Sequence, residues 1–282
     1  KNQNPVGGSL LSFLVGQNRR FWYVCPRWSS MHFVPIKTVA QQDIQALHRV
    51  RERLVGARTA LINEMRGLFA EYGIVLPVGI KAFRKAWTET PDAEQSKLTP
   101  LSTELFGTLA KELEKVDTEI TYYEDKLHGL ATTHPEAQRL LTIPGIGPLT
   151  ATALLAAVSD VSVCKNGRQF AAWLGLVPKQ HSTGGQTRLL GISKRGDTYL
   201  RTLLIHGARA TLRWAKTKAD SRSQWIRGIL ERRGWNRTAV AVANKNARIV
   251  WAVLSRGEVY QGQPHEPRQC RAAKSVVTGK PG

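Results

Sequence analysis

Two long stretches of helical periodicity constrain the fold of this chain of 282 residues most strongly. From Thr38 to Tyr72, apolar residues recur every three or four positions with no proline between them, which predicts one long helix. A second stretch, from Phe106 to Leu130, repeats with a period of 3.5, the spacing of a heptad seam. Two such helices joined by a turn bury their apolar stripes against each other or against a second subunit. We therefore predict a mainly α protein with a helical coiled-coil arm over residues 36–133, through which the chain forms a homo-oligomer; an internal hairpin explains the same seam.

Charge is distributed unevenly along the chain. The 41 Lys and Arg residues exceed the 21 Asp and Glu residues and give a formal net charge of +20. Residues 1–130 carry 17 basic and 14 acidic side chains, whereas residues 131–282 carry 24 and 7. Such an excess indicates a polyanionic partner, and the apolar content of 42% supports a folded core rather than a disordered basic tail. We therefore predict a nucleic-acid-binding protein whose phosphate-facing region follows residue 130.

Compartment and metal use follow from the apolar runs and the cysteines. No apolar run approaches the roughly 20 residues that span a bilayer, so we expect no membrane partner. Cys25, Cys164 and Cys270 are far apart and form no Cys-x-x-Cys pair, which fits a reducing compartment and provides no zinc site. We expect a cytoplasmic protein without a metal or cofactor bound by its own residues.

The run Pro144-Gly145-Ile146-Gly147-Pro148 separates two apolar helical segments, as in a helix-hairpin-helix. There, Gly145 and Gly147 would let the backbone approach a DNA strand, and amides at the start of the next helix would donate to phosphate oxygens. An ordinary tight turn between two packed helices explains the pattern nearly as well. The basic surroundings favour the DNA-binding interpretation.

The stretch from Gly175 to Asp197 combines cations, hydroxyls and glycines with almost no acid. Ser182 lies at its centre. A serine hydroxyl is a good nucleophile only where one group takes its proton and another stabilises the charged transition state. This stretch supplies only cations, and His181 is not assigned as the base because neighbouring side chains diverge. On the residues alone, a flexible basic loop that clamps phosphates without chemistry is favoured. The predicted phosphate-binding residues here are Lys179, Gly184, Gly185, Arg188, Lys194 and Arg195, with Arg201 on the polar side of the following helix.

The remaining pattern completes a compact helical domain over residues 134–260. We expect His206 to be a packed histidine, and we expect the tail over residues 261–282 to be disordered. Four tryptophans in apolar helical registers are expected to be core or interface anchors: Trp214, Trp225, Trp235 and Trp251. Helices are predicted at about 166–176, from residue 196 onward, at 221–232 and at about 237–255.

Longer motifs carry a resemblance to a known family. They read FVPIKTVAQQDIQALHRVRERLV, IPGIGPLTA, FAAWLGLVPKQHSTGG, LLGISKRGDTYLRTLLIHGARA and ANKNARIVWAVL. Together they resemble the transposases of the IS one-ten (IS110) family of insertion sequences, in its IS eleven-eleven (IS1111) subgroup, from about Met31 to Tyr260. The resemblance implies DNA transposition directed by a structured bridge RNA that pairs with donor and target DNA. It also implies a RuvC-like domain whose Asp-Glu-Asp-Asp tetrad binds magnesium, a coiled-coil arm, and a C-terminal domain that presents a nucleophilic serine.

The resemblance assigns the nucleophile to the motif from His181 to Gly185. Ser182 is the first choice; a shift of one residue would make it Thr183, and Ser193 is a distant third. The serine would attack a DNA phosphodiester to form a phosphoserine link, with the metal of the tetrad assisting from the other domain. The attacked phosphate would be neutralised by Lys179, Arg188, Lys194 and Arg195.

The chain departs from the family pattern at its front. Only 32 residues precede Phe33, where relatives carry a full domain, and residues 1–42 contain neither Asp nor Glu. We therefore predict that the RuvC-like α/β domain is missing through N-terminal truncation and that residues 1–35 are an atypical remnant. The chain alone is then expected not to complete transposition. The alternative is a non-catalytic DNA- or RNA-binding module.

Overall fold

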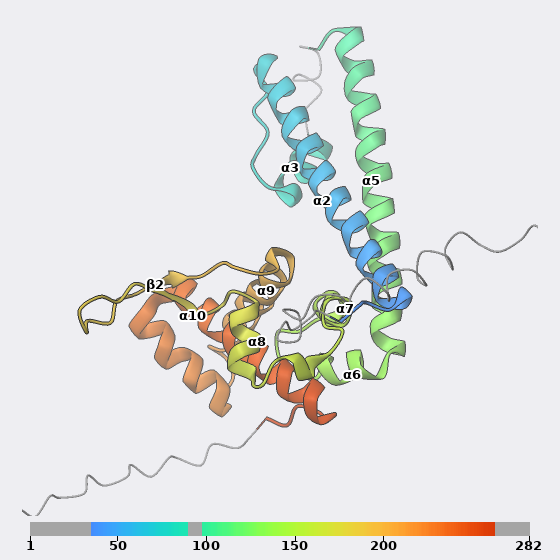
Figure 1. Ribbon diagram of the computed structural model, residues 1–282. Helices are drawn as coiled ribbons and strands as arrows, with labels where there is room; N and C mark the ends of the chain where they lie inside the picture. Colours follow the sequence, from blue (N-terminus) through green and yellow to red (C-terminus); the bar gives the residue numbers. More distant parts are fainter. Residues whose placement is uncertain (1–34, 90–97, 263–282) are drawn as a thin grey trace, which may run out of the picture. The chain divides into compact units, whose positions relative to one another are not determined.

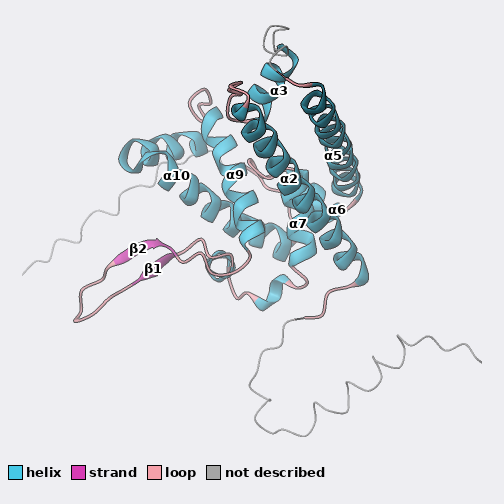
Figure 2. Ribbon diagram, turned by 90° about the horizontal axis from the view of Figure 1, so that it is seen from above, coloured by secondary structure: helices cyan, strands magenta, loops and turns pink. Residues whose placement is uncertain are grey.

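The computed structural model describes residues 35–89 and 98–262 (Figure 1). Within these ranges, the residues from Lys37 onward belong to one compact unit. The secondary structure is almost entirely helical, which confirms the predicted mainly α class (Figure 2). The elements are α2 (Val39–Glu71), α3 (Ile80–Glu89), α5 (Pro100–Thr133), α6 (Pro135–Leu141), α7 (Pro148–Ala157), the 3-10 turn η3 (Val161–Val163), α8 (Gly167–Trp173), β1 (Pro178–Gln180), β2 (Leu189–Ile192), α9 (Thr198–Trp214) and α10 (Ser221–Arg256).

Several predictions concern residues beyond these ranges. The N-terminal remnant over residues 1–35 and the tail over residues 261–282 fall, apart from three residues, outside the described part of the chain. The domain boundaries stay a prediction. In the described ranges, no helix combines the length and the apolarity that a membrane crossing requires.

The first arm helix, α2, begins where the sequence predicts it. Thr38 caps the helix: its Oγ1 accepts a hydrogen bond from the Gln41 N–H at 3.2 Å, and the Gln41 side chain accepts one from the Thr38 N–H at 3.1 Å. This reciprocal pair is a capping box, which satisfies two amides that a helix start leaves without partners. The helix ends at Glu71, next to Gly73, whose φ of 76° is easily adopted by glycine.

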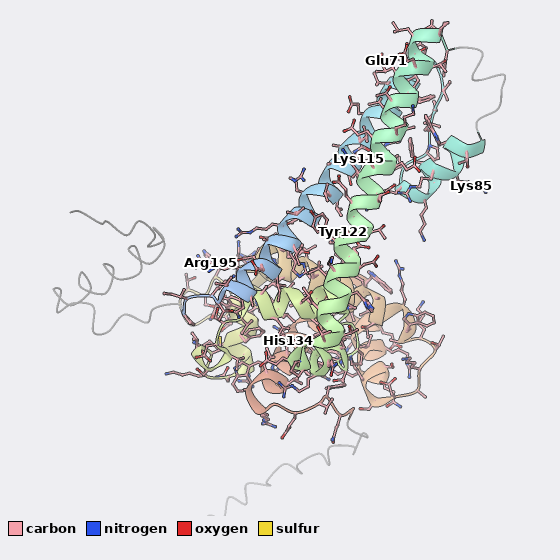
Figure 3. The ribbon with its side chains drawn as sticks, turned by 90° about the vertical axis from the view of Figure 1, so that its right-hand side faces the viewer. Glu71, Lys85, Lys115, Tyr122, His134 and Arg195 are labelled. Atoms are coloured by element: carbon pink, nitrogen blue, oxygen red, sulfur yellow. The ribbon has the colours of Figure 1, made fainter. Side chains whose placement is uncertain are left out.

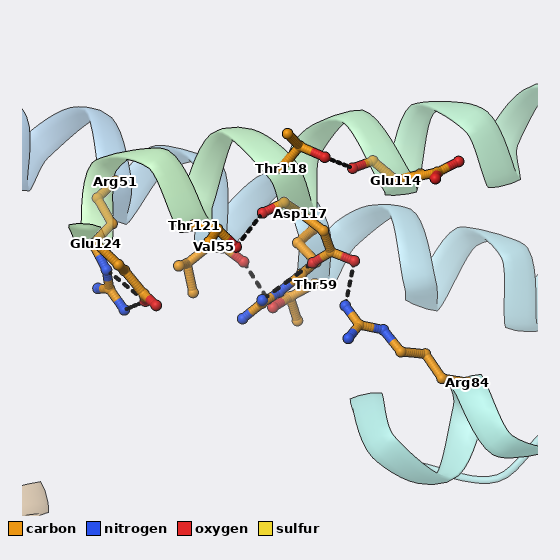
Figure 4. A network of polar contacts seen from close by, with 10 residues as sticks. Arg51, Val55, Thr59, Arg84, Glu114, Asp117, Thr118, Thr121 and Glu124 are labelled. Atoms are coloured by element: carbon orange, nitrogen blue, oxygen red, sulfur yellow. Dashed lines mark hydrogen bonds and ion pairs between the residues drawn. The ribbon is translucent and has the colours of Figure 1, made fainter. Parts of the chain in front are cut away.

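The arm is an antiparallel pair of α2 and α5, which lie side by side over most of their length (Figure 3). Arg51 of α2 contacts Glu124 of α5, whereas Phe69, farther along α2, stacks on Phe106 at the opposite end of α5. Between them, Asp117 accepts hydrogen bonds from Arg58 and from Arg84 of α3 (Figure 4). One register of the heptad seam is buried within the chain, at Phe106, Leu113, Ile120 and Leu127.

The internal hairpin thus accounts for the seam. Phe106 and Leu113 share one core with residues of α2 and α3, and α5 also contacts α7, so the periodicity needs no second subunit to explain it. Homo-oligomerisation through the arm stays a prediction.

A second core lies among α6, α7, α8, α9 and α10. Its largest buried side chains include Leu140, Leu154, Phe170, Leu200 and Leu204. Residues 150–156 of α7 are all buried, so α7 is the central helix of this core.

The root of the arm is tied to this core by polar contacts. The Gln41 side chain donates to the carbonyl oxygens of Leu155 and Val158, at 3.0 and 3.2 Å. These carbonyls lie at the end of α7, where a helix leaves acceptors without intrahelical partners. The start of α2 therefore also closes the end of α7.

The predictions for α10, for His206 and for the tryptophans differ in outcome. The two predicted helices at 221–232 and 237–255 are confirmed, with α10 broken at Gly234 by a φ of 72° and a ψ of 174°. His206 is exposed, so its prediction as a packed histidine is wrong, because it lies on the solvent side of α9. Trp214 is 65% exposed and therefore is not a core anchor of this chain. Trp225 and Trp251 pack against the second core.

Candidate nucleic-acid interface

The stretch around Ser182 forms a β-hairpin rather than an irregular loop. β1 and β2 pair antiparallel, with Pro178 opposite Ile192 at the root (Figure 2). At the tip, Thr183 and Gln186 form a bridge around Gly184 and Gly185, whose φ values are 57° and 76°. Positive φ at both central residues is the type I′ turn, which follows the twist of paired strands and strongly favours glycine. The two glycines predicted to contact phosphate thus shape the tip of the hairpin.

Ser182 is exposed just before this tip. Its Oγ lies 3.0 Å from the Gln180 Nε2 and 3.3 Å from the Arg188 backbone nitrogen, and both groups donate to it. These contacts orient the hydroxyl. Neither donor can take up a proton. In the described part of the chain, Ser182 therefore has two groups that orient its hydroxyl and no hydrogen-bonded base that could remove its proton. Ser193, the third candidate, lies at the root of the hairpin with its Oγ buried.

The predicted cations surround the hairpin. Lys179 and Arg188 are exposed on the hairpin, and Lys194 and Arg195 are exposed at its root. Within the described ranges, none of the four side chains forms an ion pair. They are therefore available to a phosphate, and their role in binding one stays a prediction.

At the root of the hairpin, the backbones of the two chain segments that enter and leave it lie very close together. Gly175 has a φ of 70°, and a Cβ there would lie 2.0 Å from the Arg195 carbonyl oxygen. Gly196 has a φ of 89°, and a Cβ there would lie 2.0 Å from the Trp173 carbonyl oxygen. Any larger residue at either position would push apart the two chain segments that enter and leave the hairpin.

Arg201 joins the same two segments by hydrogen bonds. Its Nη1 donates to the carbonyl oxygens of Leu174 and Arg195, each at 3.3 Å, and its Nη2 donates to the Thr198 hydroxyl at 3.1 Å. The residue is 7% exposed, so the prediction that it lies on the polar side of its helix is wrong. The physical reason is local: the carbonyls at the hairpin root need donors, and a guanidinium supplies several in one plane.

The glycines of the Pro144–Pro148 turn have different surroundings. Gly145, with a φ of 90°, faces α9, and a Cβ there would lie 2.8 Å from the Gly207 carbonyl oxygen and 2.5 Å from the Thr211 Oγ1. Gly147 caps α7, and the space around its Cβ position is open. Gly145 is therefore explained by packing against α9, as the tight-turn alternative has it. Phosphate binding at this turn stays a prediction.

A basic groove, which the sequence did not predict, runs along α10. Its volume is about 1780 Å³, and it is bordered by Pro144 of the turn and by Pro178 and Ile192 of the hairpin root. Its wall includes the aromatic rings of Trp225 and Tyr260. Six cations line it: Arg168, Arg222, Arg237, Lys245, Arg248 and Arg256. They come from α8 and both halves of α10, so no single motif signals the groove; the repeated Arg and Lys between residues 222 and 256 were the available sign.

Lys245 shows how crowded these charges are. Its Nζ lies 4.0 Å from the centroid of the Trp225 ring. Burial lowers the pKa of Lys245, and the nearby Arg222 and Arg248 lower it further. A negative charge in the groove would relieve this repulsion.

The magnesium tetrad implied by the resemblance has no counterpart in residues 35–89 and 98–262. No three His, Cys, Asp or Glu side chains there come together in a group that could hold a metal ion. The residues described do not fit such a metal.

Comparison with known proteins identifies the family. Residues 137–224, which include the turn, the serine hairpin and α9, match the family described as "Transposase IS116/IS110/IS902 family". The chain is 52% identical over 233 residues to a probable family 20 transposase of Pseudomonas aeruginosa, with 82% of this chain and 69% of the relative covered. It is 49% identical to the transposase for insertion sequence element IS1111A of Coxiella burnetii, covering 83% of this chain and 64% of the relative. It is 40% identical to the transposase for IS1328 of Yersinia enterocolitica, covering 82% and 68%. The chain thus spans about two thirds of the length of these relatives, and it belongs to the IS116/IS110/IS902 family of transposases.

Proposed function

We propose that this chain is the DNA-handling part of an insertion-sequence transposase, in which Ser182 attacks a DNA phosphodiester. The observation that carries the proposal is the hydroxyl itself: it is exposed near the tip of the hairpin and accepts hydrogen bonds from the Gln180 Nε2 and the Arg188 backbone nitrogen. Lys179 and Arg188 are exposed on the same hairpin. Membership of the family supplies the reaction class.

The proposed step is a displacement at phosphorus. A bond forms between the Ser182 Oγ and phosphorus while a bond from phosphorus to a deoxyribose oxygen breaks, which leaves a phosphoserine link. Exposed cations of the hairpin stabilise the negative charge that grows on the phosphate oxygens. The proton of Ser182 has to leave to a base that the described residues do not supply. The chain is therefore proposed to react only with a segment or subunit that contributes the carboxylate tetrad.

The partners follow from the same proposal. DNA is the substrate, and a structured bridge RNA is the proposed guide, supported by the 49% identity to the IS1111A transposase and by the motifs of that subgroup. A second copy of the chain, joined through the arm, is the proposed route by which a complete active site assembles.

A non-catalytic DNA- or RNA-binding module is the second candidate. It is favoured by the absence of an imidazole or carboxylate contact to Ser182 in the described ranges. The same cationic hairpin then clamps phosphates through its hydroxyls without a covalent step.

Trapping of a covalent protein–DNA adduct separates the two candidates. The chain is incubated with a nicked insertion-sequence end and with the full-length Pseudomonas aeruginosa relative, in which the matching serine is replaced by alanine. Only this chain can then form the adduct. We expect a labelled adduct from the unaltered chain and from Thr183→Ala, and none from Ser182→Ala. An adduct kept by Ser182→Ala and lost by Thr183→Ala would move the nucleophile to Thr183, and DNA binding without any adduct would favour the binding module.

A further inference from the structure

We propose that the basic groove along α10 binds the phosphodiester backbone of one nucleic-acid strand, continuing from the root of the serine hairpin. This groove is separate from the Ser182 hydroxyl. The inference needs no covalent chemistry, so it stands or falls independently of the nucleophile.

The first support is uncompensated charge. The six groove cations face two acids of the same wall, Asp220 and Glu258. Asp220 is already engaged as the cap of α10, where its carboxylate accepts from the Ser223 hydroxyl at 2.6 Å. The ion pairs of the described residues lie in the arm and in α6, and none includes a groove cation. A concave surface of this kind attracts a polyanion.

The terminal segments of the chain do not carry the charge that would neutralise the groove. The sequence from residue 263 to 282 contains four cations and one acid, and residues 1–34 contain four cations and no acid. We infer that a phosphodiester chain supplies the negative charge. Phosphodiester chains supply regularly spaced negative charges that such a groove can follow.

The second support is the position of the groove between two motifs. At one edge, the Pro144 carbonyl accepts hydrogen bonds from the Arg222 Nη2 and the Asn246 Nδ2, both at 3.1 Å. At the other edge, the Asn244 Nδ2 donates to the Leu176 carbonyl at 3.2 Å, just before β1. Residues of α10 thus fix both the glycine turn and the root of the hairpin. A nucleic-acid strand that is bound at the hairpin root would therefore enter the groove beside Pro178 and Ile192.

The arrangement of the cations favours one strand over a duplex. Beyond the break at Gly234, Arg237, Lys245, Arg248 and Arg256 form one row of about 28 Å along one side of α10. The other two groove cations make no second row, because Arg168 stands alone on α8 and Arg222 already donates to the Pro144 carbonyl and the Asn246 Oδ1. A single row follows a single backbone. A duplex presents two backbones separated by a groove about 12 Å or about 6 Å wide, and reading both requires a second row of cations.

Fluorescence anisotropy of the full chain with labelled oligonucleotides tests this inference. The probes are single-stranded DNA, single-stranded RNA of the same sequence, a DNA duplex of the same length and a polyglutamate peptide. The groove variant is Arg168→Gln/Arg248→Gln. Its control, Arg213→Gln/Lys216→Gln, removes the same charge from exposed residues of α9 and its end. A second groove variant, Arg237→Gln/Arg256→Gln, changes two exposed residues at other points of the row.

For single strands we expect both groove variants to bind about tenfold more weakly, and the slope of log K against log salt to fall by about 1.4, since each lost phosphate contact removes about 0.7. The control should change affinity by less than about twofold. Comparison of the affinities for the DNA and RNA probes shows which of the two single strands the groove binds more tightly. Equal losses in groove and control variants, tighter duplex binding that depends on the same residues, or equal binding of polyglutamate would each overturn the inference.

Discussion

Arg201 is the residue on which the position of the serine hairpin depends most. Its guanidinium bridges the carbonyls of Leu174 and Arg195, which lie on opposite sides of the hairpin root. Lysine keeps the charge but has no planar fork of donors. We predict that Arg201→Lys lowers the free energy of unfolding by about 1–3 kcal/mol, because buried carbonyls lose their partners.

Hydrogen exchange shows whether that effect reaches the hairpin. The Ser193 amide donates to the Val177 carbonyl at 2.8 Å, so its exchange reports on the root. It should exchange faster in Arg201→Lys and normally in Arg213→Lys, an exposed position of α9. Unchanged exchange at Ser193 in the Arg201 variant would remove Arg201 from the role of positioning residue.

His48 makes the stability of the chain depend on pH. It is 4% exposed, and its ring nitrogens lie 3.0 Å from the Tyr199 hydroxyl and 3.0 Å from the Thr152 Oγ1. Burial, aided by Arg51, lowers the pKa of His48 from 6.5 to about 4. The unfolded chain therefore binds the proton first as the pH falls from 6.5 towards 4, and folding loses free energy in that window.

The expected loss from His48 is about 2 kcal/mol of unfolding free energy between pH 7.5 and pH 5. Urea unfolding at the two pH values measures it. His48→Gln should show a smaller difference between the two pH values, whereas His206→Gln, on the exposed side of α9, should keep the full difference. Equal pH dependence in the two variants would contradict the assignment to His48.

The two histidines also show where sequence reasoning stops. Both stand in helical segments with apolar neighbours, and the pattern selected His206 as the packed one. Burial of His48 depends on α7 and α9, which follow it by about 100 and 150 residues and supply its partners Thr152 and Tyr199. No local pattern encodes that contact.

At the scale of elements, the two glycines of the turn between α6 and α7 differ in how closely they pack against α9. Gly145→Ala should lower the free energy of unfolding by more than about 2 kcal/mol, since its φ is 90° and its Cβ would clash with backbone of α9. Gly147→Ala meets open space and should leave the thermal midpoint nearly unchanged. Thermal unfolding of the matched pair checks this, and equal destabilisation would show that the turn is not held by α9.

The helices were predictable and the hairpin was not, for physical reasons. Repeats of three and four residues mark α2 and α5 because each buries one continuous stripe against the other. The strands of the hairpin are exposed on both faces, so burial leaves no alternating pattern in Lys179 to Ile192. The pair Gly184-Gly185 was the available signal, because two-residue turns of this type favour glycine.

At the scale of the whole molecule, the uneven charge marks a region of the chain and not a surface. The excess of cations lies after residue 130, where the hairpin and the groove also lie. That this region faces phosphate stays a prediction. The groove itself joins residues of the turn, the hairpin root, α8 and α10, which are separated by up to about 100 residues along the chain. Only the packing of α10 against α8 and α9 brings them together.

The hairpin and the basic groove are proposed to form one nucleic-acid face. Photocrosslinking of the full chain to DNA and RNA strands, with the attached peptides located by mass spectrometry, tests this proposal. We expect attachment within residues 178–195 and 222–260, reduced in Arg168→Gln/Arg248→Gln and unchanged in Arg213→Gln/Lys216→Gln. Attachment concentrated on the arm, within residues 39–133, and indifferent to the groove variant would contradict it.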